Sequence, residues 1–200
     1  MKINDGSMDH SKKELPVVTF GVANDWREWL ASNHSGTTGL WLRFFKKDSG
    51  KQTFNYSQAL DEALCYGWID GQAKRVDEES YMQKFTPRRK NSLWSKRNTE
   101  HIERLIREGR MKPAGLKEIE DAKADGRWAK AYNSPVNMEL PDDFRDELAK
   151  DRKALAFFES LNKTNKYAIV WRLETAKKPE TRKRRMDKIL DMLSKGEKFH

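Results

Sequence analysis

The residues best suited to chemistry lie in two short segments, 68–71 and 85–95. The first supplies a carboxylate, Asp70, and the second supplies two adjacent arginines, Arg88 and Arg89. An arginine fork makes paired hydrogen bonds with a carboxylate or a phosphate, so adjacent arginines are typical of a site that holds an anion. A carboxylate beside them could act as an acid or base, or could orient one arginine.

The second segment adds further groups that suit an anion. Hydroxyl groups can donate to it, a helix beginning after Ser95 or Asn98 would offer free N–H groups, and Trp94 could stack on a base or on an arginine plane. The predicted ligand-binding residues are Asp70, Arg88, Arg89, Ser92, Trp94, Ser95, Lys96 and Arg97. A structural interpretation stays open, in which Trp68 and Trp94 lie in the core and Asp70 forms a salt bridge with an arginine.

Positive charge is concentrated in two parts of the chain. The net charge is +9, with +5 in residues 74–110 and +5 in residues 177–200. Residues 84–97 hold six cations and no acid, and residues 177–185 hold six cations and one acid. Such clustering favours an anionic partner, although a charge run is also typical of a solvated face.

The second cluster falls on a predicted C-terminal helix that begins at Pro179, because the residue before a proline avoids the helical region. Cations in the first turns of a helix are disfavoured by its dipole. The basic residues of this helix are Arg182, Lys183, Arg184, Arg185 and Lys188. An anionic partner would explain them, and so would an ion pair with the acidic stretch at 142–147.

No metal site, cofactor or cysteine nucleophile is expected. The histidines share no ligand spacing, and the single cysteine, Cys65, sits in an apolar helix where it acts as a small hydrophobe. Neither a P-loop nor a GxGxxG motif is present. Catalysis is therefore the less favoured hypothesis, with Asp70 as its one weak candidate.

The elements that must position these residues form a helix-rich α+β fold. Strands are predicted at 17–20 and 39–45, and a hairpin at 69–76 and 81–85 around a polar turn. Because Pro87 ends the second hairpin strand, Arg88 and Arg89 should project from a rigid exit loop near Asp70.

Helix signals surround these strands. Asn24 and Ser57 should cap the first two helices, and Gly67 should end the second. Further helices are expected after Ser95 or Asn98 and from Pro113, and three amphipathic helices near the C-terminus.

Four regions follow from this pattern. Residues 1–15 form a flexible tail, and residues 16–132 form an α+β domain with a small, mostly antiparallel sheet and flanking helices. Residues 133–141 form a linker, and residues 142–200 form a C-terminal helical unit. No apolar run could span a membrane, no secretory core is present and one cysteine excludes an internal disulfide, so we expect a cytoplasmic protein without membrane insertion.

Several strings of residues resemble a known family, the YdeI/OmpD-associated or bacteriocin-protection proteins. They are ALCYGWIDG (63–71), FTPRR (85–89), SLWS (92–95), GRMKPAG (109–115), AKADGRW (122–128), YAIVWR (167–172) and AKKPETR (176–182). The resemblance spans roughly residues 17–200, and the family's named domain resembles the C-terminal helical unit. The name describes a phenotype, so the resemblance implies no reaction, cofactor or catalytic residue.

Three hypotheses follow. The leading one is a non-catalytic cytoplasmic binding protein for an anionic ligand, nucleic acid among them, in a stress or bacteriocin-protection response. The second is an enzyme on a small anionic substrate, with Asp70 as acid or base and Arg88 and Arg89 as an anion clamp. The third is a protein–protein adaptor that uses the C-terminal helices, and the oligomeric state stays open.

Overall fold

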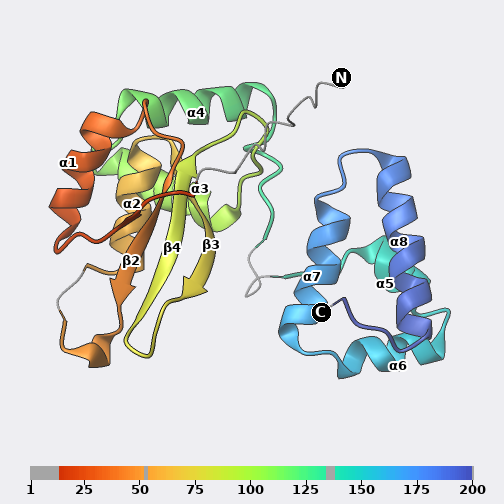
Figure 1. The fold of residues 1–200 in the computed structure, drawn as a ribbon. Helices are drawn as coiled ribbons and strands as arrows, with labels where there is room; N and C mark the ends of the chain where they lie inside the picture. The colour runs from red at the N-terminus through yellow and green to blue at the C-terminus, as the bar shows by residue number, and fades with distance from the viewer. Residues whose placement is uncertain (1–13, 52–53, 134–137, 200) are drawn as a thin grey trace, which may run out of the picture. The chain divides into compact units, whose positions relative to one another are not determined.

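A computed structural model describes residues 14–51, 54–133 and 138–199 (Figure 1). The chain divides into two compact units, the first comprising residues 1–92 and 104–121 and the second residues 93–103 and 122–200. Residues 1–13 of the predicted tail and residues 134–137 of the predicted linker lie outside the described parts. Across those parts, no helix is long and apolar enough to cross a membrane.

The first unit contains a four-stranded mixed sheet with helices, which confirms the predicted α+β class. Its elements are β1 (Val17–Val18), α1 (Ala23–Asn33), β2 (Leu40–Phe45), the 3₁₀ turn η1 (Lys47–Ser49), α2 (Tyr56–Cys65), β3 (Trp68–Arg75), β4 (Ser80–Pro87) and most of α4 (Pro113–Ala124). Helix α3 (Lys96–Arg107) and the last turn of α4 cross between the units. The strand order is β1-β2-β4-β3; β1 and β2 run parallel, and the β2–β4 and β3–β4 pairs run antiparallel. The predicted hairpin is confirmed as β3 and β4.

Alternation along β2 separates the two faces of the sheet. Leu40, Leu42 and Phe44 are buried, whereas the intervening side chains are only half-buried. Helix α1 packs on the buried face, since the rings of Trp26 and Phe85 lie 5.7 Å apart. This apolar side forms the core of the unit, because strand side chains alternate between faces.

Two predicted helix caps are wrong. Helix α1 begins after Val22, so Asn24 already lies in its first turn and donates to Glu28 instead. Helix α2 is capped by Asn55, whose side-chain oxygen accepts from Gln58 N at 2.9 Å while the Gln58 side chain returns to Asn55 N. This reciprocal capping box satisfies two donors, which Ser57 inside the helix could not do.

Two glycines allow α4 to pack tightly against the end of α2. Gly67 has φ +75°, as its predicted helix-ending role requires, and a Cβ there would lie 3.1 Å from Ala114 O. A Cβ at Gly115 would lie only 2.3 Å from Cys65 O. Side chains at either position would push the two helices apart.

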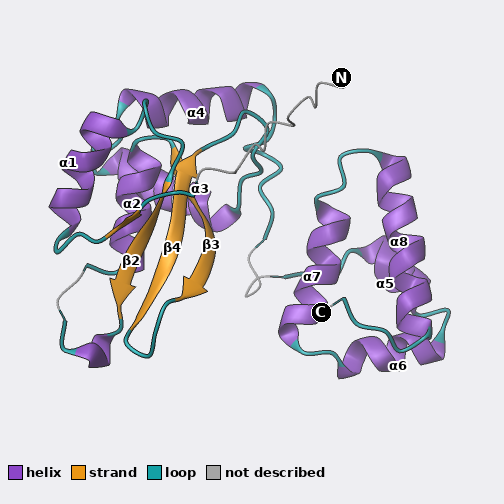
Figure 2. Ribbon diagram, in the orientation of Figure 1, coloured by secondary structure: helices purple, strands orange, loops and turns teal. Residues whose placement is uncertain are grey.

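The second unit is helical over residues 138–199, where Figure 2 shows no strand. Its helices there are α5 (Asp142–Leu148), α6 (Arg152–Ser160), α7 (Lys163–Glu174) and α8 (Pro179–Ser194). The prediction of three helices is wrong, because Asp151 accepts from the N–H groups of Lys153 and Ala154 and so starts α6 separately from α5. Their apolar core includes Ile189 and Leu193 of α8.

Candidate functional site

The loop after β4 does not present both predicted arginines. Arg88 is 7% exposed and its backbone N–H donates to Gly67 O at 3.0 Å, so the chain is still bound to the hairpin there. The expectation that Arg88 projects from the loop is therefore wrong. Arg89 is exposed, in a turn in which Arg89 N donates to Ser92 Oγ and Ser92 N donates to Arg89 O.

Asp70 lies at the same end of the hairpin, opposite Phe85 in the strand register. Its carboxylate accepts a hydrogen bond of 2.7 Å from the hydroxyl of Tyr56 on α2. An anion clamp beside Asp70 would have Arg89 as its exposed arm, because Arg88 is buried. Of the two arginines in the enzyme hypothesis, Arg89 is therefore the exposed one.

Trp94 is a core residue of the second unit. It is 1% exposed, and its ring lies 5.1 Å from that of Trp128. Trp68 is likewise fully buried in the first unit, so the structural interpretation of both tryptophans is confirmed. Ser95 caps α3 as predicted, with its Oγ accepting from Asn98 N at 3.2 Å.

Helix α3 then carries two of the predicted ligand-binding cations. Lys96 and Arg97 are both exposed in its first turn. They belong to the second unit, whereas Asp70, Arg88, Arg89 and Ser92 belong to the first.

The basic helix α8 uses two of its arginines inside the second unit. Arg182 makes bonds of 2.6 and 2.7 Å to the Asp143 carboxylate and also donates to Leu173 O at 2.8 Å. Arg185 donates to Arg172 O, so both arginines satisfy carbonyls at the end of α7. The predicted ion pair with the acidic stretch is confirmed at Arg182, while the remaining cations, Lys183, Arg184 and Lys188, are exposed.

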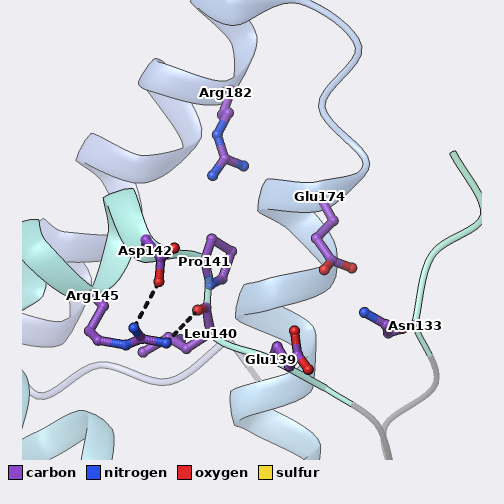
Figure 3. A pocket seen from close by; sticks show the side chains of 8 residues that line it. All are labelled: Asn133, Glu139, Leu140, Pro141, Asp142, Arg145, Glu174 and Arg182. Carbon is purple, nitrogen blue, oxygen red and sulfur yellow. Dashed lines mark hydrogen bonds and ion pairs between the residues drawn. The ribbon is translucent and has the colours of Figure 1, made fainter.

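A cavity of about 360 Å³ lies beside this ion pair in the second unit (Figure 3). It is lined by Asn133, Glu139, Leu140, Pro141, Asp142, Arg145, Glu174 and Arg182. Burial raises the pKa of Glu174 from its ordinary value, and Arg145 binds Asp142 and Leu140 O within the wall. With three carboxylates facing two arginines, the cavity offers no surplus of positive charge to an anion.

The sheet of the first unit carries aromatic rings and cations on the side opposite the core. We call this side the open sheet face and define it by Trp41, Arg43, Phe45, Lys74, Met82 and Lys84. The ammonium of Lys74 lies 4.6 Å from the Trp41 ring, and Lys84 is the register partner of Trp41 on β4. The guanidinium of Arg43 lies 5.0 Å from the Phe45 ring. The alternation in LWLRFF (40–45) is the signal that could have identified this face.

A cleft of about 590 Å³ adjoins the open sheet face at Phe45. We call it the lysine cleft; its described lining residues are Phe44, Phe45, Lys46, Lys47, Lys51, Phe54, Asn55, Tyr56 and Tyr81. Phe44 and Tyr81 stack with centroids 5.4 Å apart, and Phe54 meets Phe44 edge-on at 5.7 Å. The cleft therefore combines flat aromatic walls with three lysines.

A buried ion network on α2 was also missed. Glu62 accepts from Arg27 twice at 2.8 Å and from Arg110 at 2.7 Å. Its neighbour Asp61 accepts from Arg104 at 2.6 and 2.7 Å. Two adjacent acids inside the otherwise apolar stretch ALDEALC (59–65) were the available signal, because buried carboxylates require partners. The network holds α1, α2, the end of α3 and the segment that follows it together.

Comparison with protein families places the two parts of the chain separately. Residues 18–118 match the family described as a domain of unknown function (DUF8412), and the chain belongs to that family. Residues 137–196 match the family described as bacteriocin-protection, YdeI or OmpD-associated, to which the chain is related. The predicted resemblance is confirmed for this C-terminal segment, whereas the preceding domain matches a different family.

Comparison with curated proteins gave no match. Comparison with solved structures gave none either.

Proposed function

We propose that this protein is a non-catalytic binding protein for single-stranded nucleic acid, and that the open sheet face is its binding surface. The observation that carries the proposal is the pairing of Trp41 with Lys74 and Lys84 on that face. Proteins that bind single strands combine aromatic side chains, on which bases stack, with cations that follow the phosphates.

The interaction energies favour replacement of the Lys74 ammonium on the Trp41 ring by a bound base. A cation over an exposed ring contributes about 0.5–1 kcal/mol, whereas base stacking on an aromatic side chain contributes about 1–3 kcal/mol. A base that stacks on Trp41 therefore displaces the Lys74 ammonium, which then pairs with the adjacent phosphate. A duplex gains less here, because its bases are already stacked on each other.

Charge supports the proposal over a wider area. The chain carries +9, and Arg43, Lys74 and Lys84 supply cations across two neighbouring strand pairs. Asp77 accepts from Arg43 at 2.7 Å, which leaves the two lysines as the principal phosphate contacts. Residues 137–196 match a family named for bacteriocin protection, and we propose that binding of single strands serves such a response.

The test is fluorescence anisotropy of labelled single- and double-stranded DNA between about 50 and 200 mM salt. We expect tighter binding of the single strand, and Trp41→Ala to weaken it about 5- to 150-fold through lost stacking. Trp41→Phe should restore most of the affinity.

Two control variants locate the surface. Trp171→Ala removes a 36% exposed tryptophan of the second unit and should leave the affinity unchanged. Arg89→Ala/Lys90→Ala tests the loop after β4 and should change it less than Trp41→Ala. Absence of binding at low salt, or equal losses in Trp41→Ala and Trp171→Ala, would overturn the proposal.

A further inference from the structure

We infer that the lysine cleft binds a nucleotide, with the base between its aromatic walls and the phosphate at Lys46 and Lys47. The inference rests on the proposed function in one respect, since the nucleotide is either free or the end of the bound strand. Both sources share one chemistry, a planar aromatic base that carries a phosphate.

The size and walls of the cleft suit a base. Its volume of about 590 Å³ falls within the range of small-molecule pockets, about 300–1,000 Å³. Phe44 and Phe54 are 1% and 6% exposed, so they form a rigid floor. The half-buried ring of Tyr81 stacks on Phe44 from the adjacent strand and is the member of this pair to which a planar ring can add.

The charges of the cleft suit a phosphate. Three lysines line it, and no aspartate or glutamate is found among its described lining residues. Lys51 is paired with Glu79 at 2.6 Å, and Lys46 donates to the carbonyl of Glu78 at 2.7 Å. Lys46 and Lys47 are both exposed, and Lys47 begins η1. Since Lys51 already holds a carboxylate, these two adjacent lysines are the ones we assign to the phosphate.

Polar groups that line the cleft can fix the orientation of the base. The cap of α2 uses the side-chain oxygen of Asn55, so the amide nitrogen of that side chain can donate to a base edge. The Tyr56 hydroxyl is held by Asp70 at 2.7 Å and fixes that wall. Burial raises the pKa of Tyr81 above its ordinary value.

The cleft meets the proposed strand-binding surface at Phe45, although Phe44 and Tyr81 in its wall belong to the core side of the sheet. Phe45 lines the cleft and also belongs to the open sheet face, where Arg43 and Lys51 lie on its ring at 5.0 Å. A strand that crosses Trp41 along β2 therefore has to turn past Phe45 to place its terminal nucleotide in the cleft.

The test is isothermal titration of the full chain with adenosine 5′-monophosphate, adenosine and inorganic phosphate. We expect the monophosphate to bind about tenfold more tightly than adenosine, because the phosphate adds charge-assisted hydrogen bonds. Inorganic phosphate alone should bind more weakly than either. Inorganic phosphate that binds as tightly as the monophosphate would overturn the inference, since the aromatic walls would then contribute nothing.

Variants separate this inference from the proposed function. Lys46→Ala/Lys47→Ala should reduce monophosphate affinity to that of adenosine, and Tyr81→Leu should weaken both ligands, with thermal unfolding as the check that each variant is folded. Trp41→Ala should leave monophosphate affinity unchanged while it weakens single-stranded DNA. Strand binding without saturable monophosphate binding overturns the inference and keeps the proposed function. Monophosphate binding without strand binding overturns the proposed function and keeps the inference.

Two labelled strands identify the source of the nucleotide. A strand with a 5′-phosphate that binds more tightly than its 5′-hydroxyl counterpart assigns the cleft to the strand end. Equal affinities, together with monophosphate binding that depends on Lys46 and Lys47, assign it to a free nucleotide.

Discussion

The cations of the second unit and those of the open sheet face are used in different ways. On α8, Arg182 holds Asp143 with two short bonds and also reaches Leu173 O, while Arg185 reaches Arg172 O. On the sheet, Lys74 lies over the ring of Trp41 and is exposed. Positive charge alone therefore does not identify a binding surface.

The difference follows from the geometry of the two cation types. A guanidinium offers several donors in a rigid fork and can hold a carboxylate and a helix end at once, so it is readily used as a structural clamp. An ammonium over a ring makes a weak contact that a phosphate can replace. The comparison predicts that changes on α8 affect folding, whereas changes on the sheet affect binding.

The largest expected effect is loss of folding in the second unit when residues 179–200 are removed. Ile189 and Leu193, which are 1% and 2% exposed, leave the core with this helix, and Asp143 loses Arg182. We expect the helical circular-dichroism signal of α5 to α7 to be lost as well. An adaptor helix would instead detach and leave those helices folded, which would contradict the account of α8.

A smaller effect is expected from Glu62→Gln in the first unit. The Glu62 side chain is 4% exposed and faces Arg27 and Arg110, so a neutral amide leaves two cations without their carboxylate. Breaking such a pair should lower the free energy of unfolding by about 3 kcal/mol, the lower end for buried pairs because Arg27 is 44% exposed.

The matched control is Glu79→Gln, which breaks the exposed pair with Lys51. It should cost about 0–1 kcal/mol by urea unfolding. Equal costs for the two variants would show that the α2 network does not hold the first unit together.

The smallest effect concerns alkaline pH. Burial raises the pKa of the Cys65 thiol to about 11 from its ordinary 9.0, so the unfolded chain loses this proton first. The stability that the neutral thiol contributes is present below pH 9 and is lost as pH rises to 11.

The free energy of unfolding of the first unit, measured in urea, should therefore be lower at pH 10.5 than at pH 8. This fall should be smaller in Cys65→Ala than in the unaltered chain. In the second unit, burial raises the pKa of Tyr167 to about 12. The stability that the neutral Tyr167 phenol contributes is therefore lost at a higher pH than that of the thiol. An identical fall with and without the thiol would contradict this assignment.

Local patterns in the sequence predicted the elements better than they predicted the roles of single side chains. The hairpin and the helix starts at Pro113 and Pro179 follow from turn residues and proline geometry, which act over a few residues. The caps at Asn24 and Ser57 were wrong because neighbouring residues compete for the same N–H groups.

The candidate site depends on packing between distant segments. Burial of Arg88 follows from its bond to Gly67, and the structural use of Arg182 follows from Asp143, in another helix. The alternation in LWLRFF separates the two faces of β2, but the cations that Lys74 and Lys84 add to the open sheet face depend on the register of β3 and β4. Predicted roles for Asp70, Arg89, Lys96 and Arg97 remain predictions.

The most direct test compares two double variants that each remove two lysines. Anisotropy with single-stranded DNA is measured against salt for Lys74→Ala/Lys84→Ala and for Lys183→Ala/Lys188→Ala. The account predicts that the first variant lowers the magnitude of the log–log salt slope by about 1.4, the loss of two phosphate contacts, and that the second leaves it unchanged. Equal slopes in the two variants, or a loss confined to α8, would contradict the account.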